Sequence, residues 1–168
     1  MKFQPWRTAR YYQLKFLRLK GDPESIARGA SLGTFIGITP TLPFHTILLL
    51  LFCPLFRGNL IAALLAATIV SNPFTFFFQY YFSWIVGKWL FPSSVSWSEI
   101  QSLLNFITGD ATFRQSIEAV MHLGKDSILP LVVGGCLLAA PCAALVYFLI
   151  RSAIVRFRNK RLKKHILS

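Results

Sequence analysis

Three long uncharged stretches dominate the pattern of apolar and polar positions along the chain. Positions 29–56, 59–87 and 128–150 contain no Asp, Glu, Lys or Arg and consist mostly of apolar side chains. An apolar stretch of about 18 residues or more is typical of a segment that enters a lipid bilayer. Because a soluble domain of 168 residues would not need three such stretches, the pattern predicts an integral membrane protein.

The first stretch is divided in two by prolines. Asp22 followed by Pro23 indicates a helix start, since Asp is favourable as an N-cap and Pro at the first helical position. This helix is predicted to end at Pro40 and Pro43, because proline removes a backbone donor and clashes with the preceding turn. Each half is about 20 Å long as a helix, against a hydrocarbon thickness of about 30 Å. We therefore predict that 29–56 is a re-entrant helical hairpin.

The second stretch contains a similar interruption. Ser71-Asn72-Pro73 combines an N-cap residue with proline at the first helical position, inside an apolar run. The segment 59–90 is long enough to cross a bilayer, and we predict a crossing segment that is broken near Asn72-Pro73. The alternative is a second hairpin at this break, which would need another element to cross the membrane.

The charged residues lie mostly at the ends of the chain. They make up 14% of the sequence, whereas soluble domains carry about 25%. Seven of the 18 basic residues lie in 1–28 and seven more in 151–168, which places both ends in the cytoplasm by the positive-inside rule. The loop 91–127 has no positive excess and is therefore predicted to lie outside.

Two cytoplasmic ends require an even number of crossings, whereas the chain has three apolar stretches. A re-entrant 29–56 resolves this, returns Arg57 to the cytoplasmic side and leaves 59–90 and 128–150 as the crossings. Two amphipathic runs in the external loop are expected to form helices on or near the membrane surface. The predicted fold is an all-α membrane protein with a re-entrant helical hairpin, two membrane-crossing segments and two short amphipathic helices in the external loop.

All these parts are assigned to one membrane domain over residues 1–168. Its basic N-terminal segment is either an interfacial helix that anionic lipids attract or the ordinary basic flank of a membrane helix. The predicted order is an interfacial segment 1–28, the hairpin 29–56, the broken segment 59–90, the external loop 91–127, the transmembrane helix 128–150 and a basic cytoplasmic tail 151–168.

Small residues recur at four-residue intervals in two of the predicted helices. Such residues form a face that another helix can approach closely, which is how membrane helices pack together. The predicted helix-packing residues are Gly29, Gly33 and Gly37 in the first helix and Gly135, Ala139 and Ala143 in the last.

Composition and motifs argue against several functions. The net charge of +12 would suit nucleic acid, but its position is explained by topology, so no nucleic-acid partner is expected. The chain lacks a phosphate-binding Gly-Lys-Ser/Thr loop and the His-Glu-x-x-His and Gly-x-Ser-x-Gly motifs, so we predict no enzyme, catalytic residue or cofactor. Cys53, Cys136 and Cys142 are expected to be reduced and buried. No metal site is predicted, because Cys136 and Cys142 have no nearby His or carboxylate.

Three motifs resemble a known family. Gly21–Ala27 (GDPESIA), Gly33–Pro40 (GTFIGITP) and Val70–Thr75 (VSNPFT) are similar, in this order, to the bacterial integral membrane family catalogued as domain of unknown function 2062. The resemblance spans about residues 11–150. It implies a protein of the bacterial inner membrane, and some relatives carry this domain joined to a glycosyltransferase. It implies no established activity and no catalytic residues.

The two proline-marked breaks are the most informative feature for function. A half-helix that starts inside the membrane directs free N–H groups and a positive dipole end toward its surroundings, which suits an anion. Secondary transporters place substrate sites at broken helices. The alternative is that the polar side chains there only satisfy the freed backbone groups. The candidate substrate-binding residues are Thr39, Thr41, His45, Ser71 and Asn72.

Two functions are therefore kept open. The first is transport or flipping of an anionic or lipid-linked envelope intermediate by a multi-pass inner-membrane protein in contact with anionic lipids. Since two crossings and a hairpin cannot easily enclose a path, it would be a homo-oligomer. The second is a non-catalytic scaffold or regulator of an envelope-biogenesis enzyme, such as a glycosyltransferase. Transport would depend on the breaks, whereas a scaffold would depend on the loop 91–127 or the basic tail.

Overall fold

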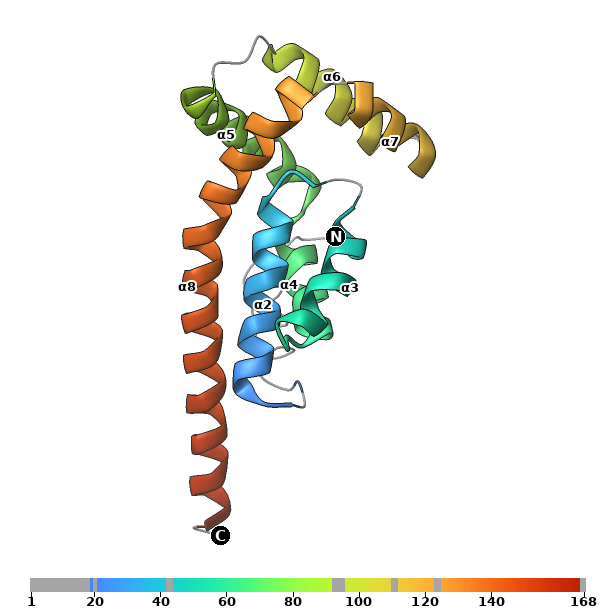
Figure 1. The fold of residues 1–168 in the computed structure, drawn as a ribbon. Helices are drawn as coiled ribbons and strands as arrows, with labels where there is room; N and C mark the ends of the chain where they lie inside the picture. Colours follow the sequence, from blue (N-terminus) through green and yellow to red (C-terminus); the bar gives the residue numbers. More distant parts are fainter. Residues whose placement is uncertain are drawn as a thin grey trace, which may run out of the picture.

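The computed structural model describes residues 19, 21–41, 44–91, 96–109, 112–122 and 125–166. Regular structure within these ranges is entirely helical (Figure 1), which confirms the predicted all-α class. Most of the predicted interfacial segment 1–28, namely residues 1–18 and 20, lies outside them. The helices are α2 (Pro23–Ile38), α3 (His45–Leu55), α4 (Leu60–Val70), α5 (Pro73–Leu90), α6 (Trp97–Thr108), α7 (Phe113–His122) and α8 (Lys125–Ile166).

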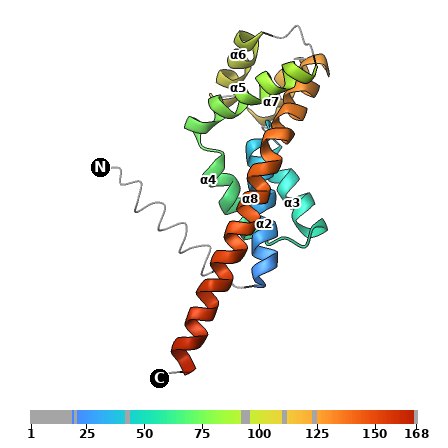
Figure 2. The ribbon, with the colours of Figure 1, turned by 90° about the vertical axis from the view of Figure 1, so that its left-hand side faces the viewer.

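Three short helices and one long helix form the body of the molecule. The chain rises through α2, returns through α3 and rises again through α4, while α8 passes along the other side of α2 (Figures 1 and 2). The turn from α3 to α4 lies beside the start of α2, because the Asn59 N–H donates to the Ser25 carbonyl at 2.8 Å. Buried Ile26, Ala62 and Ile154 join α2, α4 and α8 in one apolar cluster.

The start of α2 forms as the sequence predicts. Asp22 is the N-cap, and its carboxylate accepts the Ser25 N–H at 3.2 Å, with Pro23 at the first position of the helix. The helix ends at Thr39, whose backbone is extended before Pro40. The two half-length helices α2 and α3 are therefore separated at the predicted proline break.

The second break is sharper than a kink. Helices α4 and α5 are bent by 87° around Ser71 and Asn72. After this bend, α5 runs against the first turns of α8, where a side chain added at Gly87 or Gly134 would overlap the facing backbone. Among the described residues, one helix segment, 128–160 of α8, is long and apolar enough to cross a membrane, and the bent pair adds a second if it counts as one span.

The last helix is longer than predicted. Instead of ending near residue 150, α8 continues without interruption for 42 residues to Ile166, through Pro130 and Pro141. The residues after Ile150 are mainly Arg, Lys, Leu and Ala, which are good helix formers. The change from apolar to basic residues therefore does not mark the end of the helix.

The loop 91–127 contains the two predicted helices, α6 and α7. However, part of the apolar face of α6 packs against other helices of the protein. Ile100 and Leu104 are buried against Tyr80 of α5 and Leu131 of α8. Helix α6 therefore belongs to the packed structure, and its amphipathic pattern reflects a protein contact.

Candidate functional site

The two helix breaks lie next to each other. The Ser71 hydroxyl at the end of α4 donates to the Gly37 carbonyl near the end of α2, at 3.0 Å. A methyl group on Gly37 would lie 3.1 Å from the same hydroxyl oxygen. A glycine at this position therefore lets the polar side chain of one break reach the backbone of the other.

His45 is the first residue of α3, and its side chain lies beside the two helix breaks. Its ring lies beside the carbonyls of Ile36 and Gly37 at the end of α2. The ring atom Nε2 is buried and has no hydrogen-bond partner among the described residues. A buried polar atom without a partner is costly, so His45 Nε2 is a candidate for binding a ligand.

A small pocket brings His45 and Ser71 together. It has a volume of about 240 Å³ and lies between α3 and α4. Thr46 and Thr68 also line it, and both were missed in the sequence, although Thr68 stands one helical turn before Ser71 in an otherwise apolar run. The Thr68 hydroxyl donates to the Leu64 carbonyl at 2.8 Å, which leaves its oxygen able to accept.

Thr39 and Thr41 are not in this pocket. The Thr39 hydroxyl donates to the Phe35 carbonyl at 2.8 Å, and the Thr41 hydroxyl to the Ile36 and Thr39 carbonyls at 3.4 and 3.3 Å. These bonds add to the backbone bonds at the end of α2, where the Phe35 and Thr39 carbonyls also accept the N–H groups of Thr39 and Thr41. Both residues instead line an apolar groove of about 540 Å³ between α2, α3 and α8.

Asn72 is exposed and begins α5. Its backbone N–H donates to the Thr75 hydroxyl at 3.0 Å. The Val70 carbonyl, freed by the bend, accepts from the Thr75 hydroxyl at 2.6 Å and from the Gln79 amide at 3.0 Å. Gln79 was not predicted as part of the break, although it is the one amide side chain in the aromatic run that follows Pro73.

The predicted packing residues lie between helices of the same chain. A side chain at Gly29 or Gly33 would overlap the backbone of α4, at Asn59 or Ala63. On α8, Gly135 faces the ring of Pro40. Ala139 and Ala143 are buried, and the Ala143 carbonyl accepts the Ser31 hydroxyl of α2 at 2.9 Å. These faces set the spacing of the helices that carry the site.

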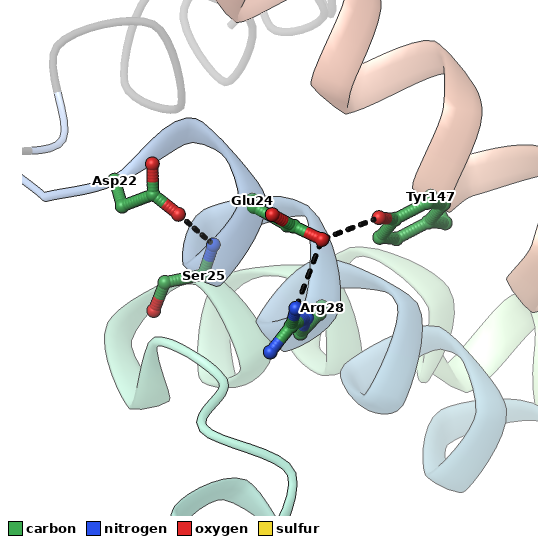
Figure 3. A network of polar contacts seen from close by, with 5 residues as sticks. All are labelled: Asp22, Glu24, Ser25, Arg28 and Tyr147. Atoms are coloured by element: carbon green, nitrogen blue, oxygen red, sulfur yellow. Dashed lines mark hydrogen bonds and ion pairs between the residues drawn. The ribbon is translucent and has the colours of Figure 1, made fainter.

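A polar network ties the start of α2 to α8 (Figure 3). The Glu24 carboxylate accepts from the Arg28 guanidinium at 2.8 Å and from the Tyr147 hydroxyl at 3.4 Å. The hydrogen bond and charge of Arg28 hold the pKa of Glu24 below its usual range, and Glu24 raises the pKa of Arg28. This network lies at the opposite end of α2 from the breaks.

The cysteines differ in their surroundings. Cys53 is buried, Cys136 is half-buried in the wall of the apolar groove and Cys142 is exposed on α8, so the prediction that all three are buried was correct only for Cys53. The side chain of Cys142 falls on the outer face of α8, which an apolar sequence alone does not reveal. In the described part of the chain, no group of three His, Cys, Asp or Glu residues is placed to hold a metal ion.

These features define an all-helical protein with a helix of membrane-crossing length and two adjacent helix breaks at a small pocket that contains His45 and Ser71. The chain belongs to the family described as an uncharacterized protein conserved in bacteria, domain of unknown function 2062, which matches residues 6–163. This confirms the family that the three sequence motifs indicate. Comparison with curated proteins and with solved structures gives no match.

Proposed function

We propose that this protein binds an anionic or lipid-linked envelope intermediate at the pocket between its two helix breaks and moves it across the bacterial inner membrane. The hydrogen bond from Ser71 to the Gly37 carbonyl carries the proposal, because it brings the two breaks together beside His45. Helices α3 and α5 both begin at the breaks. Their first N–H groups and positive dipole ends favour an anion.

The proposed topology has both ends of the chain in the cytoplasm. Helices α2 and α3 form a re-entrant hairpin that enters from the cytoplasmic side, and Arg57 returns to that side. The bent pair α4 and α5 forms one crossing and α8 the other. The distribution of Lys and Arg and the length of α8 support this arrangement.

A homo-oligomer is part of this proposal. The pocket of about 240 Å³ is too small to be a path across a membrane by itself. Large apolar side chains cover the outer face of α8, including Leu145, Phe148 and Leu149, each at least 59% exposed. In a bilayer this face meets lipid or a second copy.

The test is identification by mass spectrometry of the molecules that co-purify with the protein from its native membrane. We expect one phosphorylated species to be enriched over bulk phospholipid. It should be lost in Ser71→Ala and in His45→Leu. It should be kept in Ser31→Ala, which removes a similar bond between helices away from the pocket. Bulk phospholipid alone in the wild-type protein, or retention in both pocket variants, would contradict the proposal.

The alternative is a scaffold for an envelope enzyme, and the continuation of α8 beyond the bundle favours it (Figure 1). In this case the basic residues of the tail would bind the partner. Neutral substitutions at Arg156 and Lys160, which are exposed, would then abolish function, whereas Ser71→Ala would be tolerated. The opposite result would favour transport.

A further inference from the structure

The apolar groove between α2, α3 and α8 is separate from the pocket at the breaks. The groove and the pocket share no lining residue. At one end the groove reaches Thr39 and Cys136 at the level of the breaks, and at the other it reaches Leu32 and Phe56 near the turn between α3 and α4. It therefore follows the length of the half-helices.

The size of the groove argues against a helix as its occupant. A helix is about 10–12 Å wide, so a cylinder of that width with the groove volume of about 540 Å³ would be only about 5–7 Å long, or roughly one turn. A volume of this size is typical of a small-molecule pocket, for which the range is about 300–1,000 Å³. A single hydrocarbon chain fits these dimensions better than a protein segment.

The described residues that line the groove offer no hydroxyl group in need of a hydrogen-bond partner. Its two hydroxyl groups, on Thr39 and Thr41, already donate to backbone carbonyls. Phe52 and Phe56 lie along one wall with their ring centroids 6.3 Å apart. The groove therefore suits a wholly apolar occupant.

The end of the groove near the turn carries a basic residue at an unusual position. Arg57 directly follows Phe56, is exposed, and has a φ of 51°. This left-handed conformation favours glycine or asparagine over arginine. The turn thus keeps an exposed basic residue directly after Phe56 of the groove wall, where the backbone alone would favour another residue.

From these features we infer that the groove holds one hydrocarbon chain of an anionic membrane lipid, with the headgroup at Arg57 and the chain directed toward the breaks. This orientation is that of a lipid in the leaflet on the Arg57 side, since half-length helices reach about the middle of a bilayer. The inference goes beyond the proposed function, because a lipid bound here needs no transport at the pocket.

The experiment uses the full-length protein in nanodiscs with equal amounts of phosphatidylglycerol and phosphatidylcholine, followed by native mass spectrometry. The wild-type protein should retain one lipid, mostly phosphatidylglycerol. Phe52→Trp should lower the retention of this lipid, because the larger ring narrows the groove. The matched control is Leu51→Trp on the outer face of the same helix, where Leu51 is 64% exposed, and it should keep the lipid.

Substitutions at Arg57 test the headgroup. Arg57→Gly should fold at least as well as the wild-type protein, because glycine suits the positive φ. Its preference for phosphatidylglycerol should nevertheless fall about fivefold, the effect of one basic residue at an anionic surface. Arg57→Lys should keep the preference. An unchanged preference in Arg57→Gly, or full retention of lipid in Phe52→Trp, would overturn the inference.

Cys136 reports directly on what occupies the groove. In a variant with Cys53→Ser and Cys142→Ser, a photoreactive maleimide on Cys136 should crosslink to phosphatidylglycerol in preference to phosphatidylcholine. The same reagent on Cys142, which is exposed, should show no such preference. A crosslink from Cys136 to a second copy, or to residues 1–18 of the same chain, would reject a lipid as the occupant. Ser71→Ala should change none of these results, which separates this test from that of the proposed function.

Discussion

Gly33 and Ala63 meet where α2 lies against α4, because neither residue has a side chain large enough to hold the helices apart. The same small residues bring the polar groups of the breaks within hydrogen-bonding distance, since Gly37 follows Gly33 by one turn and accepts from Ser71. At the scale of single residues, packing and the site are therefore linked. A change that separates α2 from α4 should also separate the two breaks.

A methyl group at Gly33 tests this link. Gly33→Ala should destabilise the protein by about 1–3 kcal/mol, because the added carbon would overlap the Ala63 carbonyl. Gly37→Ala should cost less, because its methyl group would meet the Ser71 hydroxyl at 3.1 Å, and a side chain can move. Thermal unfolding in detergent measures both variants, and equal losses would show that α2 and α4 are not in close contact at Gly33.

At the scale of elements, the contacts of α2 with α8 are both apolar and polar. They combine small residues with polar bonds, from Ser31 to the Ala143 carbonyl and from Tyr147 to Glu24. Nearer the C-terminal end of α8, the Arg158 guanidinium donates to the Gly21 carbonyl, just before α2, at 2.6 Å. The basic part of α8 thus holds the start of α2 in place.

Acid should weaken this contact between α2 and α8. Because Arg28 lowers the pKa of Glu24 in the folded protein, the ionised carboxylate stabilises the fold above its unfolded pKa of about 4.3. This stabilisation is lost as the pH falls through the folded pKa. The difference in unfolding temperature between the wild-type protein and Glu24→Gln should therefore shrink below about pH 4.3.

The control for this prediction is Glu118→Gln on α7. This substitution removes an exposed ion pair between Glu118 and Arg114, which are four residues apart, as Glu24 and Arg28 are. Unlike Glu24, Glu118 makes no hydrogen bond to α8 among the described residues. Glu118→Gln should change the unfolding temperature less than Glu24→Gln at neutral pH. If the unfolding temperatures of the wild-type protein and Glu24→Gln differ by the same amount from pH 7 to pH 3, the charge of Glu24 does not stabilise the fold.

At the scale of the whole molecule, the topology can be tested by labelling with a membrane-impermeant maleimide. Variants with one cysteine at position 57, 98 or 159 are made in a background without the native cysteines. In spheroplasts, Ser98→Cys should react at once, whereas Arg57→Cys and Asn159→Cys should react only after permeabilisation. A reaction at position 57 from outside would mean that 29–56 crosses the membrane instead of re-entering it.

The sequence predicts those features of the molecule that depend on local chemistry. The helix starts at Asp22 and Asn72 follow from capping residues beside proline, and the break after Ile38 follows from Pro40. The continuation of α8 past Ile150 was missed, because a change in charge was interpreted as an end of the helix although charge alone does not break one.

The composition of the site depends on contacts between distant segments, and the sequence does not contain these directly. The five candidate residues were chosen by type and position near the breaks. The structure separates Thr39 and Thr41 from His45 and Ser71, and it adds Thr46 and Thr68. Which hydroxyl groups face each other depends on the angle between helices, and here that angle is set by glycine contacts and by the 87° bend.

The bond between Ser31 and Ala143 also has a consequence for biosynthesis, because it joins positions 112 residues apart. Helix α2 leaves the ribosome early, and α8 leaves it last. In the proposed topology, the hairpin stands in the membrane until α8 arrives, with one side uncovered and the irregular backbone of its break unprotected, which a bilayer does not tolerate well. Helix α8 therefore completes the packing around α2, and chains that end before Ala143 should be substrates for membrane quality-control proteases.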